Sequence, residues 1–165
     1  GGAHVIGALP RSIDATVTGS RLFPIGTNPY TPVEVNITAA GTGTGTLTAS
    51  ATAGDHPSAA DANLMLDRYW TLTPSGISGA TATLAFNYLD GDVTGGLVEA
   101  NMIAASWNGS SWTTYPGTVI DTVNNTATVT GVTSFSDWTL IAPGAATPTP
   151  TATPSGVYDW KMIKY

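Results

Sequence analysis

Cysteine is absent from the 165-residue chain, which excludes disulfide bonds, thiol catalysis and cysteine-based metal sites. Charge is scarce: 10% of the residues are charged, with 5 Lys and Arg against 11 Asp and Glu, for a net charge of −6. Because nucleic acids and anionic membrane surfaces are bound through basic patches, this balance argues against both as partners. No apolar run reaches the roughly 18 residues of a transmembrane helix, so no membrane insertion is expected.

Long helical patterns are also missing, and 19 Gly and 11 Pro divide the chain into short segments. In two segments apolar residues alternate with polar ones, the period that places every second side chain on one face of a strand. The residues sharing a face are Val33, Val35 and Ile37 in one segment, and Ala82, Leu84, Phe86 and Tyr88 in the other. The sequence predicts about nine to eleven short strands in an all-β, antiparallel β-sandwich, Ig-like or jelly-roll-like.

Local patterns give further expectations for single segments. Residues 13–18 are expected to form a strand, followed by a turn at Gly19-Ser20. Pro24 makes residues 22–26 an edge strand or a packed loop. Residues 41–46 alternate Gly and Thr, which predicts a loop or a thin strand where side chains have no room. The densest apolar segment, residues 64–72, is expected to be ended by Pro74-Ser-Gly76.

Two β-hairpins are expected in the second half of the chain. Asn108-Gly109 and Asn124-Asn125 are the turn signals, because these residue types tolerate positive φ. Further strands are expected at residues 47–53, 99–107 and 134–141.

The chain is interpreted as a sandwich body at residues 1–142, a Pro/Thr-rich linker at 143–156 and a C-terminal strand at 157–165. Each Pro of the linker lacks an N–H and fixes φ, so an extended polyproline II conformation is expected. The linker threonines that are candidate O-glycan acceptors are Thr147, Thr149, Thr151 and Thr153. The chain begins with Gly1 rather than Met, which we interpret as a processed or partial chain.

The terminal segment is short and rich in apolar residues. The residues expected to contact a neighbouring subunit are Val157, Tyr158, Trp160, Met162, Ile163 and Tyr165. The linker would extend about 40 Å as polyproline II, enough to span one subunit. The segment also carries Lys161 and Lys164, whereas the body is acidic. These features predict that the partners are copies of the same chain, joined head to tail by strand donation.

Several motifs follow one another over residues 5–141. They are Val5-Ile-Gly-Ala-Leu-Pro-Arg11, Phe23-Pro-Ile-Gly26, Tyr30-Thr-Pro-Val33, Arg68-Tyr-Trp70, Asn87-Tyr-Leu-Asp90, Trp107-Asn-Gly-Ser-Ser-Trp112 and Gly131-Val-Thr-Ser-Phe-Ser-Asp-Trp138. This order resembles a module near the C-termini of large secreted bacterial surface proteins, mostly of unassigned function. The resemblance implies an extracellular β-sandwich at the bacterial cell surface and no catalytic residue. Many members continue into a sorting domain, whereas this chain continues into the Pro/Thr linker.

Asp90 and Asp92 are candidate Ca²⁺ ligands, with Glu99 as a further carboxylate, because this hard cation prefers several oxygen ligands. The Asp90-Gly-Asp92 motif lacks the additional acids of a full calcium loop. The alternative is a turn in which Asp accepts backbone N–H bonds. No cofactor is expected.

No set of residues in the sequence indicates catalysis. His4 and His56 have no evident partner, and the chain has no Gly-x-Ser-x-Gly elbow. Glu34 and Glu99 lie in separate expected strands and are expected to face solvent rather than a hydrolytic cleft. The protein is therefore not expected to be an enzyme.

The aromatic residues leave two interpretations open. Trp107 and Trp112 flank the Asn108-Gly109 turn and are candidates for stacking on a sugar ring. The alternative is structural, as a cross-strand pair or as core packing. Arg68, beside Tyr69 and Trp70, is expected to make a cation–π or capping contact rather than to bind a ligand.

Together these patterns predict a structural subunit of a bacterial extracellular filament or surface assembly, polymerised by strand donation of the C-terminal arm. The alternative is a surface adhesion or carbohydrate-binding module of a larger secreted protein, with glycans as partners. Both hypotheses place the protein outside the cell, at the bacterial surface.

Overall fold

The computed structural model describes residues 3–145 of the chain. The predicted terminal strand and the linker from residue 146 onward lie outside the described residues. So do the candidate glycan acceptors Thr147 to Thr153 and the candidate subunit contacts of residues 157–165. No helix within residues 3–145 is long and apolar enough to cross a membrane.

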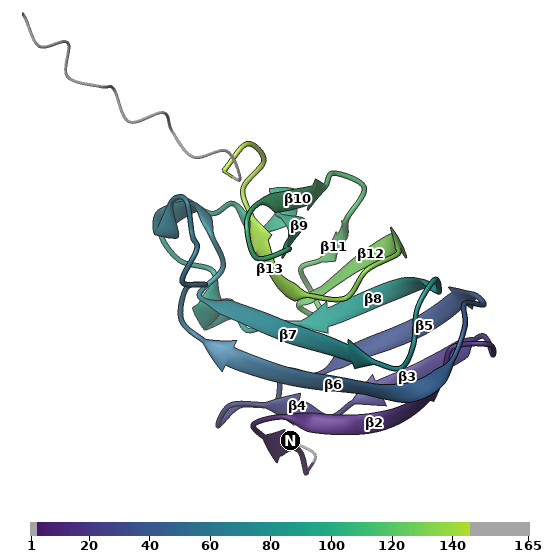
Figure 1. Ribbon diagram of the computed structural model, residues 1–165. Helices are drawn as coiled ribbons and strands as arrows, with labels where there is room; N and C mark the ends of the chain where they lie inside the picture. The colour runs from purple at the N-terminus through teal and green to yellow at the C-terminus, as the bar shows by residue number, and fades with distance from the viewer. Residues whose placement is uncertain (1–2, 146–165) are drawn as a thin grey trace, which may run out of the picture.

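The described chain is a β-sandwich of thirteen strands (Figure 1), more than the roughly nine to eleven expected from turn spacing. The strands are β1 (Val5–Ile6), β2 (Leu9–Asp14), β3 (Gly19–Phe23), β4 (Ile25–Gly26), β5 (Val33–Ala39), β6 (Thr44–Ala53), β7 (Arg68–Ser75), β8 (Thr81–Asn87), β9 (Ile103–Trp107), β10 (Trp112–Tyr115), β11 (Val119–Asp121), β12 (Thr126–Val132) and β13 (Asp137–Ile141). Short 3₁₀ turns are η1 (Ala62–Leu64), η2 (Asp90–Asp92) and η3 (Glu99–Asn101). The predicted all-β, antiparallel sandwich is confirmed.

Two sheets form the layers of the sandwich. The six-stranded sheet has the order β10-β9-β13-β7-β6-β2, and the five-stranded sheet has the order β11-β12-β8-β5-β3. Every pairing within these two sheets is antiparallel, and β1 and β4 add a small parallel pair. The order leaves β2 and β10 at the edges of one sheet and β3 and β11 at the edges of the other.

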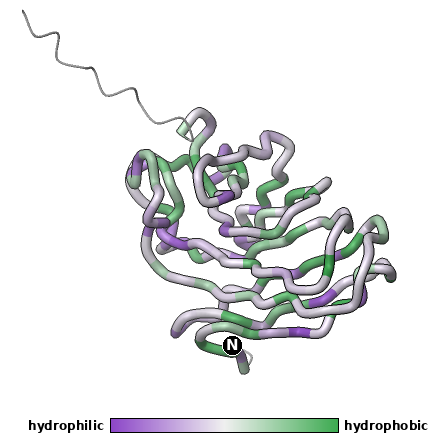
Figure 2. The backbone as a smooth tube through the Cα atoms, in the orientation of Figure 1, coloured by the Kyte–Doolittle hydropathy of each residue, from purple (hydrophilic) through white to green (hydrophobic). Residues whose placement is uncertain are grey.

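The core lies between the sheets and is built from every second residue of the strands. Hydrophobic positions, in green, recur along these strands in Figure 2. As predicted, Val33, Val35 and Ile37 are buried together from β5, and β8 buries Ala82, Leu84 and Phe86, with Tyr88 just after it. Three large aromatics fill the centre: Phe86 lies 4.9 Å from Trp70 and 5.8 Å from Trp138 between ring centroids. Such aromatic contacts contribute strongly to the stability of a small sandwich.

The first predicted strand was misplaced. Residues 13–18 do not form one strand, because β2 ends at Asp14 and β3 begins at Gly19, within the predicted turn. Asp14 causes the break: its Oδ1 accepts hydrogen bonds from the Thr16 N–H (3.0 Å) and the Thr16 hydroxyl (2.6 Å). This Asx-type turn competes with strand pairing and redirects the chain into the other sheet.

The Gly-Thr repeat at residues 41–46 behaves as predicted, with a strand where side chains have no room. β6 begins at Thr44, and a Cβ on Gly41 or Gly45 would overlap the carbonyl oxygen of Ser78 or Ser75 respectively. The glycines therefore let β6 and the preceding segment lie against the end of β7, while the threonines face outward.

The expected strand at residues 99–107 is shorter than predicted. Glu99–Asn101 forms a 3₁₀ turn, and β9 begins only at Ile103. The predicted hairpins are confirmed: β9 pairs with β10 around the Asn108-Gly109 turn, and β11 pairs with β12 around Asn125, whose φ is 50°.

Candidate functional site

Trp107 and Trp112 lie directly opposite each other in the β9–β10 hairpin, with ring centroids 5.3 Å apart. The turn between them is held by Asn108, whose Oδ1 accepts the N–H groups of Ser110 and Ser111 at 2.9 Å each. Gly109 supplies the positive φ of 97° that the turn requires. The expected cross-strand pair is therefore present on the outward face of the six-stranded sheet.

His56 lies over this pair, on the loop after β6. Its ring packs edge-on against Tyr69 and Trp112, with centroids 4.9 Å away in each case. Its Nδ1 accepts the Ser58 N–H at 3.0 Å, so the proton sits on Nε2, which donates to Asp137 at 3.1 Å. The expectation that His56 lacks a partner was wrong, because the partner lies 81 residues away in the sequence. His4 also has one: its Nε2 lies 3.0 Å from the Thr27 carbonyl oxygen.

The two tryptophans have different surroundings. Trp112 donates from Nε1 to the Ser58 carbonyl at 2.9 Å and packs against a second small core that contains Met65 and Ile141. Trp112 therefore anchors the His56 loop to the sheet. Trp107 is half-buried and lines an open groove instead. Of the two predicted stacking residues, the structure places Trp107 where a ligand has access.

The groove has a volume of about 660 Å³ and mixes aromatic with polar side chains. Its aromatic side chains are Trp107, Tyr115 and Phe135. Hydroxyl and amide groups come from residues that include Thr71, Thr73, Asn108, Thr113, Ser134 and Ser136. Asp137 is the ionisable acid of the lining, and its side chain is 29% exposed. No Lys or Arg lines it.

The groove exists because β13 begins late. Strand β13 lies between β7 and β9, but it pairs with β7 only at Asp137 and Trp138. Before Asp137 one further bond, from the Leu72 N–H to the Ser136 carbonyl at 2.9 Å, joins the two segments. Residues 133–135 then leave the sheet. The end of β7 and the β9–β10 hairpin are left as the two walls of a slot in the six-stranded sheet.

Pro74 lies on the wall formed by β7, and the strand ends at Ser75, within the predicted terminating stretch Pro74-Ser-Gly76. The Leu72 N–H points toward β13, so two residues later Pro74 occupies the next position that faces this side. No strand follows there, and a residue without an N–H leaves no donor unpaired at the open edge.

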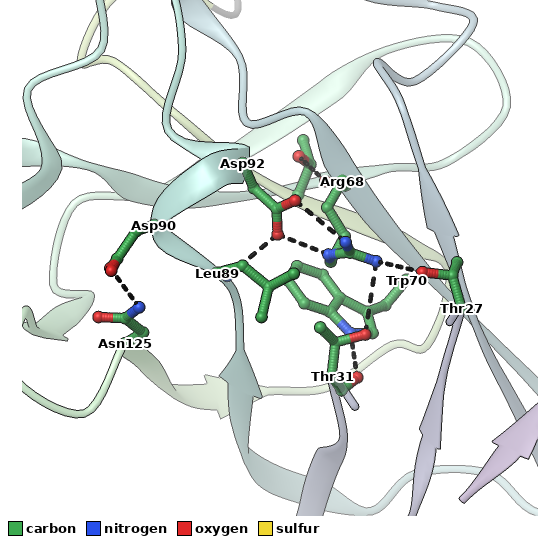
Figure 3. A network of polar contacts seen from close by, with 9 residues as sticks. Thr27, Thr31, Arg68, Trp70, Leu89, Asp90, Asp92 and Asn125 are labelled. Carbon is green, nitrogen blue, oxygen red and sulfur yellow. Dashed lines mark hydrogen bonds and ion pairs between the residues drawn. The ribbon is translucent and has the colours of Figure 1, made fainter. Parts of the chain in front are cut away.

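Arg68 and Asp92 form a buried ion pair away from the groove (Figure 3). The guanidinium donates from Nε to Oδ2 at 2.6 Å and from Nη2 to Oδ1 at 3.0 Å. Oδ2 also accepts the Leu89 N–H at 3.0 Å. The expected cation–π or capping role of Arg68 was wrong, since its charge is directed to a carboxylate far along the chain.

The carboxylates considered as calcium ligands have separate partners. Asp92 is held by Arg68, whereas Asp90 accepts from the Asn125 side-chain amide at 2.6 Å (Figure 3). Glu99 accepts the Tyr88 hydroxyl at 2.8 Å. Within residues 3–145, no group of three or more His, Asp or Glu residues has a metal-binding arrangement. The Asp92 contact to a backbone N–H is the turn alternative that the sequence left open.

The sequence indicated the hairpin tryptophans of this site, but not its other members. His56 and Asp137 come from distant segments, and although Asp137 lies in the Gly131–Trp138 motif, nothing in the sequence pairs it with His56. The groove itself depends on the residue at which β13 starts, and the alternation of apolar and polar residues does not determine that residue. Comparison with family models, curated proteins and solved structures finds no match to this chain, so the resemblance to bacterial surface proteins stays a prediction.

Proposed function

We propose that the described body is a carbohydrate-binding module of a secreted bacterial surface protein. The observation that carries this proposal is the groove in the six-stranded sheet, where Trp107, Tyr115 and Phe135 stand among hydroxyl groups and one carboxylate. Sugar rings present apolar C–H faces and hydroxyl edges, so aromatic faces and polar groups in one open groove complement both.

Two local features favour this function over other uses of the groove. Pro74 removes a backbone donor from the open edge of β7, which weakens pairing with an added peptide strand. His56 is 5% exposed, and both of its ring nitrogens are already hydrogen-bonded. The His56–Asp137 pair therefore has no free nitrogen to act as a general base, and its role is to position the loop.

The test is a glycan array probed with the wild-type protein and the variants Trp107→Ala and Trp107→Phe. We expect the alanine variant to weaken binding about tenfold, the value of one good aromatic contact, and the phenylalanine variant to retain most of it. Trp112→Phe serves as the comparison, because it removes the bond that holds the His56 loop and leaves the stacking ring unchanged. The proposal fails if no glycan is bound, or if Trp107→Ala binds as wild type does.

A second candidate is the filament subunit that polymerises by strand donation. The described body supports it through its open edges: β2 and β10 each have a neighbour on one side only, and a donated strand needs such an edge. The β2 edge has six residues and contains Pro10, and β10 has four, so each offers a short ladder.

Negative-stain microscopy of the whole chain and of a chain lacking residues 157–165 tests this candidate. Filaments from the whole chain and folded monomers from the shortened chain are expected. Filaments that persist after the deletion would exclude strand donation by this segment.

A further inference from the structure

The outward face of β6 and β7 carries a hydroxyl group at every position. The outward residues are Thr44, Thr46, Thr48, Ser50 and Thr52 on β6, and Tyr69, Thr71, Thr73 and Ser75 on β7. They oppose one another in register, as in the pairs Thr48–Thr73 and Ser50–Thr71. We call the Thr and Ser members of this set the hydroxyl strip.

The hydroxyl strip has two properties that distinguish it from an ordinary polar strand face. It contains no charged residue. In addition, none of its side-chain hydroxyls bonds to another protein group among residues 3–145. The strip therefore presents a regular row of donors and acceptors without counter-charges, which suits a neutral, hydroxyl-bearing ligand better than an ionic one.

The strip is continuous with the groove, because Thr71 and Thr73 belong to both. One cross-strand row runs through the two regions: Thr71 pairs with Asp137, and Asp137 with Trp107. Along β6 the strip covers the distance from Thr44 to Thr52, about 27 Å at the rise of an extended strand. This length exceeds that of one or two sugar rings and matches an extended polysaccharide segment.

Acidic side chains lie at both ends of the strip. Asp14 is the cross-strand neighbour of Thr44 at one end, and hydrogen bonds from Thr16 hold its pKa below the usual value. Asp55 follows the other end of β6, and Asp137 lies in the groove. An anionic sugar polymer would meet repulsion at Asp55 and Asp137 and no Lys or Arg within the strip, whereas at Asp14 the charge of Arg21 acts on the same carboxylate.

We propose that the groove and the hydroxyl strip together bind an extended, neutral polysaccharide, with the groove holding one sugar face and the strip hydrogen-bonding the chain that continues from it. This inference rests on the proposed carbohydrate-binding function. It adds the class of ligand, a polymer without carboxylate or sulfate groups, and a second contact region on β6.

The experiment is affinity gel electrophoresis in soluble polysaccharides. The neutral probes are hydroxyethyl cellulose, a galactomannan and soluble starch, and the anionic probes are carboxymethyl cellulose and alginate. The strip variant is Thr46→Val with Thr48→Val, which keeps the β-branched shape and lies outside the groove lining. The matched control is Thr83→Val with Thr128→Val on the outward face of the five-stranded sheet. Short oligosaccharides of the bound polymer are measured in parallel.

We expect at least one neutral polymer and no anionic one to retard the protein. The strip variant should bind that polymer about tenfold more weakly, as expected for two lost hydrogen bonds, and should bind short oligosaccharides as wild type does. The control variant should bind both normally.

If Trp107→Ala loses binding while the strip variant retains it, the groove function stands and the strip inference is overturned. Preference for an anionic polymer also overturns it. If no probe binds to any form, the proposed function itself fails.

Discussion

At the scale of single residues, the side chains that matter most are polar groups placed in apolar surroundings. Arg68 is 2% exposed, yet its guanidinium is matched by both oxygens of Asp92. Trp70 is fully buried, and its Nε1 donates to the Thr31 carbonyl at 3.0 Å. Trp138 is equally buried, but its Nε1 has no hydrogen-bond partner among the described residues. The energetic role of each residue therefore depends on whether its polar atom is satisfied.

This contrast predicts different costs for the same substitution at two positions. Both Trp70→Phe and Trp138→Phe remove ring volume from the core, but only the first leaves a buried carbonyl without its donor. We expect Trp70→Phe to lower the free energy of unfolding by about 1–3 kcal/mol more than Trp138→Phe does. Urea denaturation followed by far-UV circular dichroism measures the difference. Equal losses would mean that the Trp70 bond contributes nothing net.

The environment of the Tyr88 hydroxyl predicts that the free energy of unfolding depends on pH. Burial raises the pKa of its hydroxyl, and the hydrogen bond to Glu99 and the negative charges of Glu99, Asp121 and Asp90 raise it further. The folded state therefore favours the protonated phenol, and Tyr88 contributes to the free energy of unfolding. This contribution is complete below the unfolded-state pKa of about 10 and is lost as pH rises above it. Wild type should lose more stability between pH 8 and pH 11 than Tyr88→Phe does. Parallel losses in guanidinium titrations at the two pH values would contradict this assignment.

At the scale of elements, close backbone contacts and late strand starts shape the sheets. The glycines before and within β6 let that strand meet the end of β7 without side chains between them. Asp14 ends β2 by capping the turn to β3. β13 begins at Asp137 and leaves a slot beside β7, where Pro74 requires no partner. The position of the groove therefore depends on these backbone contacts, turns and strand starts more than on strand propensity.

Gly45 provides the element-scale prediction. A Cβ at this position would overlap the Ser75 carbonyl oxygen, which belongs to the paired strand and cannot move independently. Gly45→Ala should therefore destabilise the protein by about 1–3 kcal/mol, as overpacking does. Gly117→Ala is the control, since no atom lies within 4 Å of a Cβ there and its φ is not positive. Thermal unfolding of the two variants gives the comparison, and similar melting temperatures would exclude the proposed contact.

At the scale of the whole molecule, the described body forms two sheets around one main core, with a smaller core under the His56 loop. The last residue of these cores is Ala145, which is 8% exposed. Every acidic residue of the sequence except Asp159 precedes residue 143, and the basic residues after it are Lys161 and Lys164. The smaller core therefore extends to Ala145, three residues into the Pro/Thr-rich segment that the sequence placed at residues 143–156.

Truncation after Thr147 tests this view. Because the members of both cores among residues 3–145 are all retained, the free energy of unfolding should change by no more than about 0.5 kcal/mol, the usual range for changes outside a core. Chemical denaturation of the truncated and the whole chain at low protein concentration measures it. A large loss in dilute monomer would mean that the C-terminal segment stabilises its own body, which disfavours its donation to a neighbour.

Much of the fold follows from the sequence alone. Alternation placed Val33, Val35 and Ile37 on the buried face of one strand, and turn residues located both hairpins. These features are local, because side-chain periodicity and φ preference act within a few residues. The same reasoning brought Trp107 and Trp112 together.

Tertiary structure decided what local patterns do not encode. The His56–Asp137 and Arg68–Asp92 pairs join residues from distant segments, and only the order of strands brings them into contact. The late start of β13 opens the groove that Trp107 lines, while the equally half-buried Trp112 packs against the smaller core. Periodicity assigns a residue to a face of its strand, whereas its neighbours on that face are set by strand order and register, which depend on the packing of the whole sandwich.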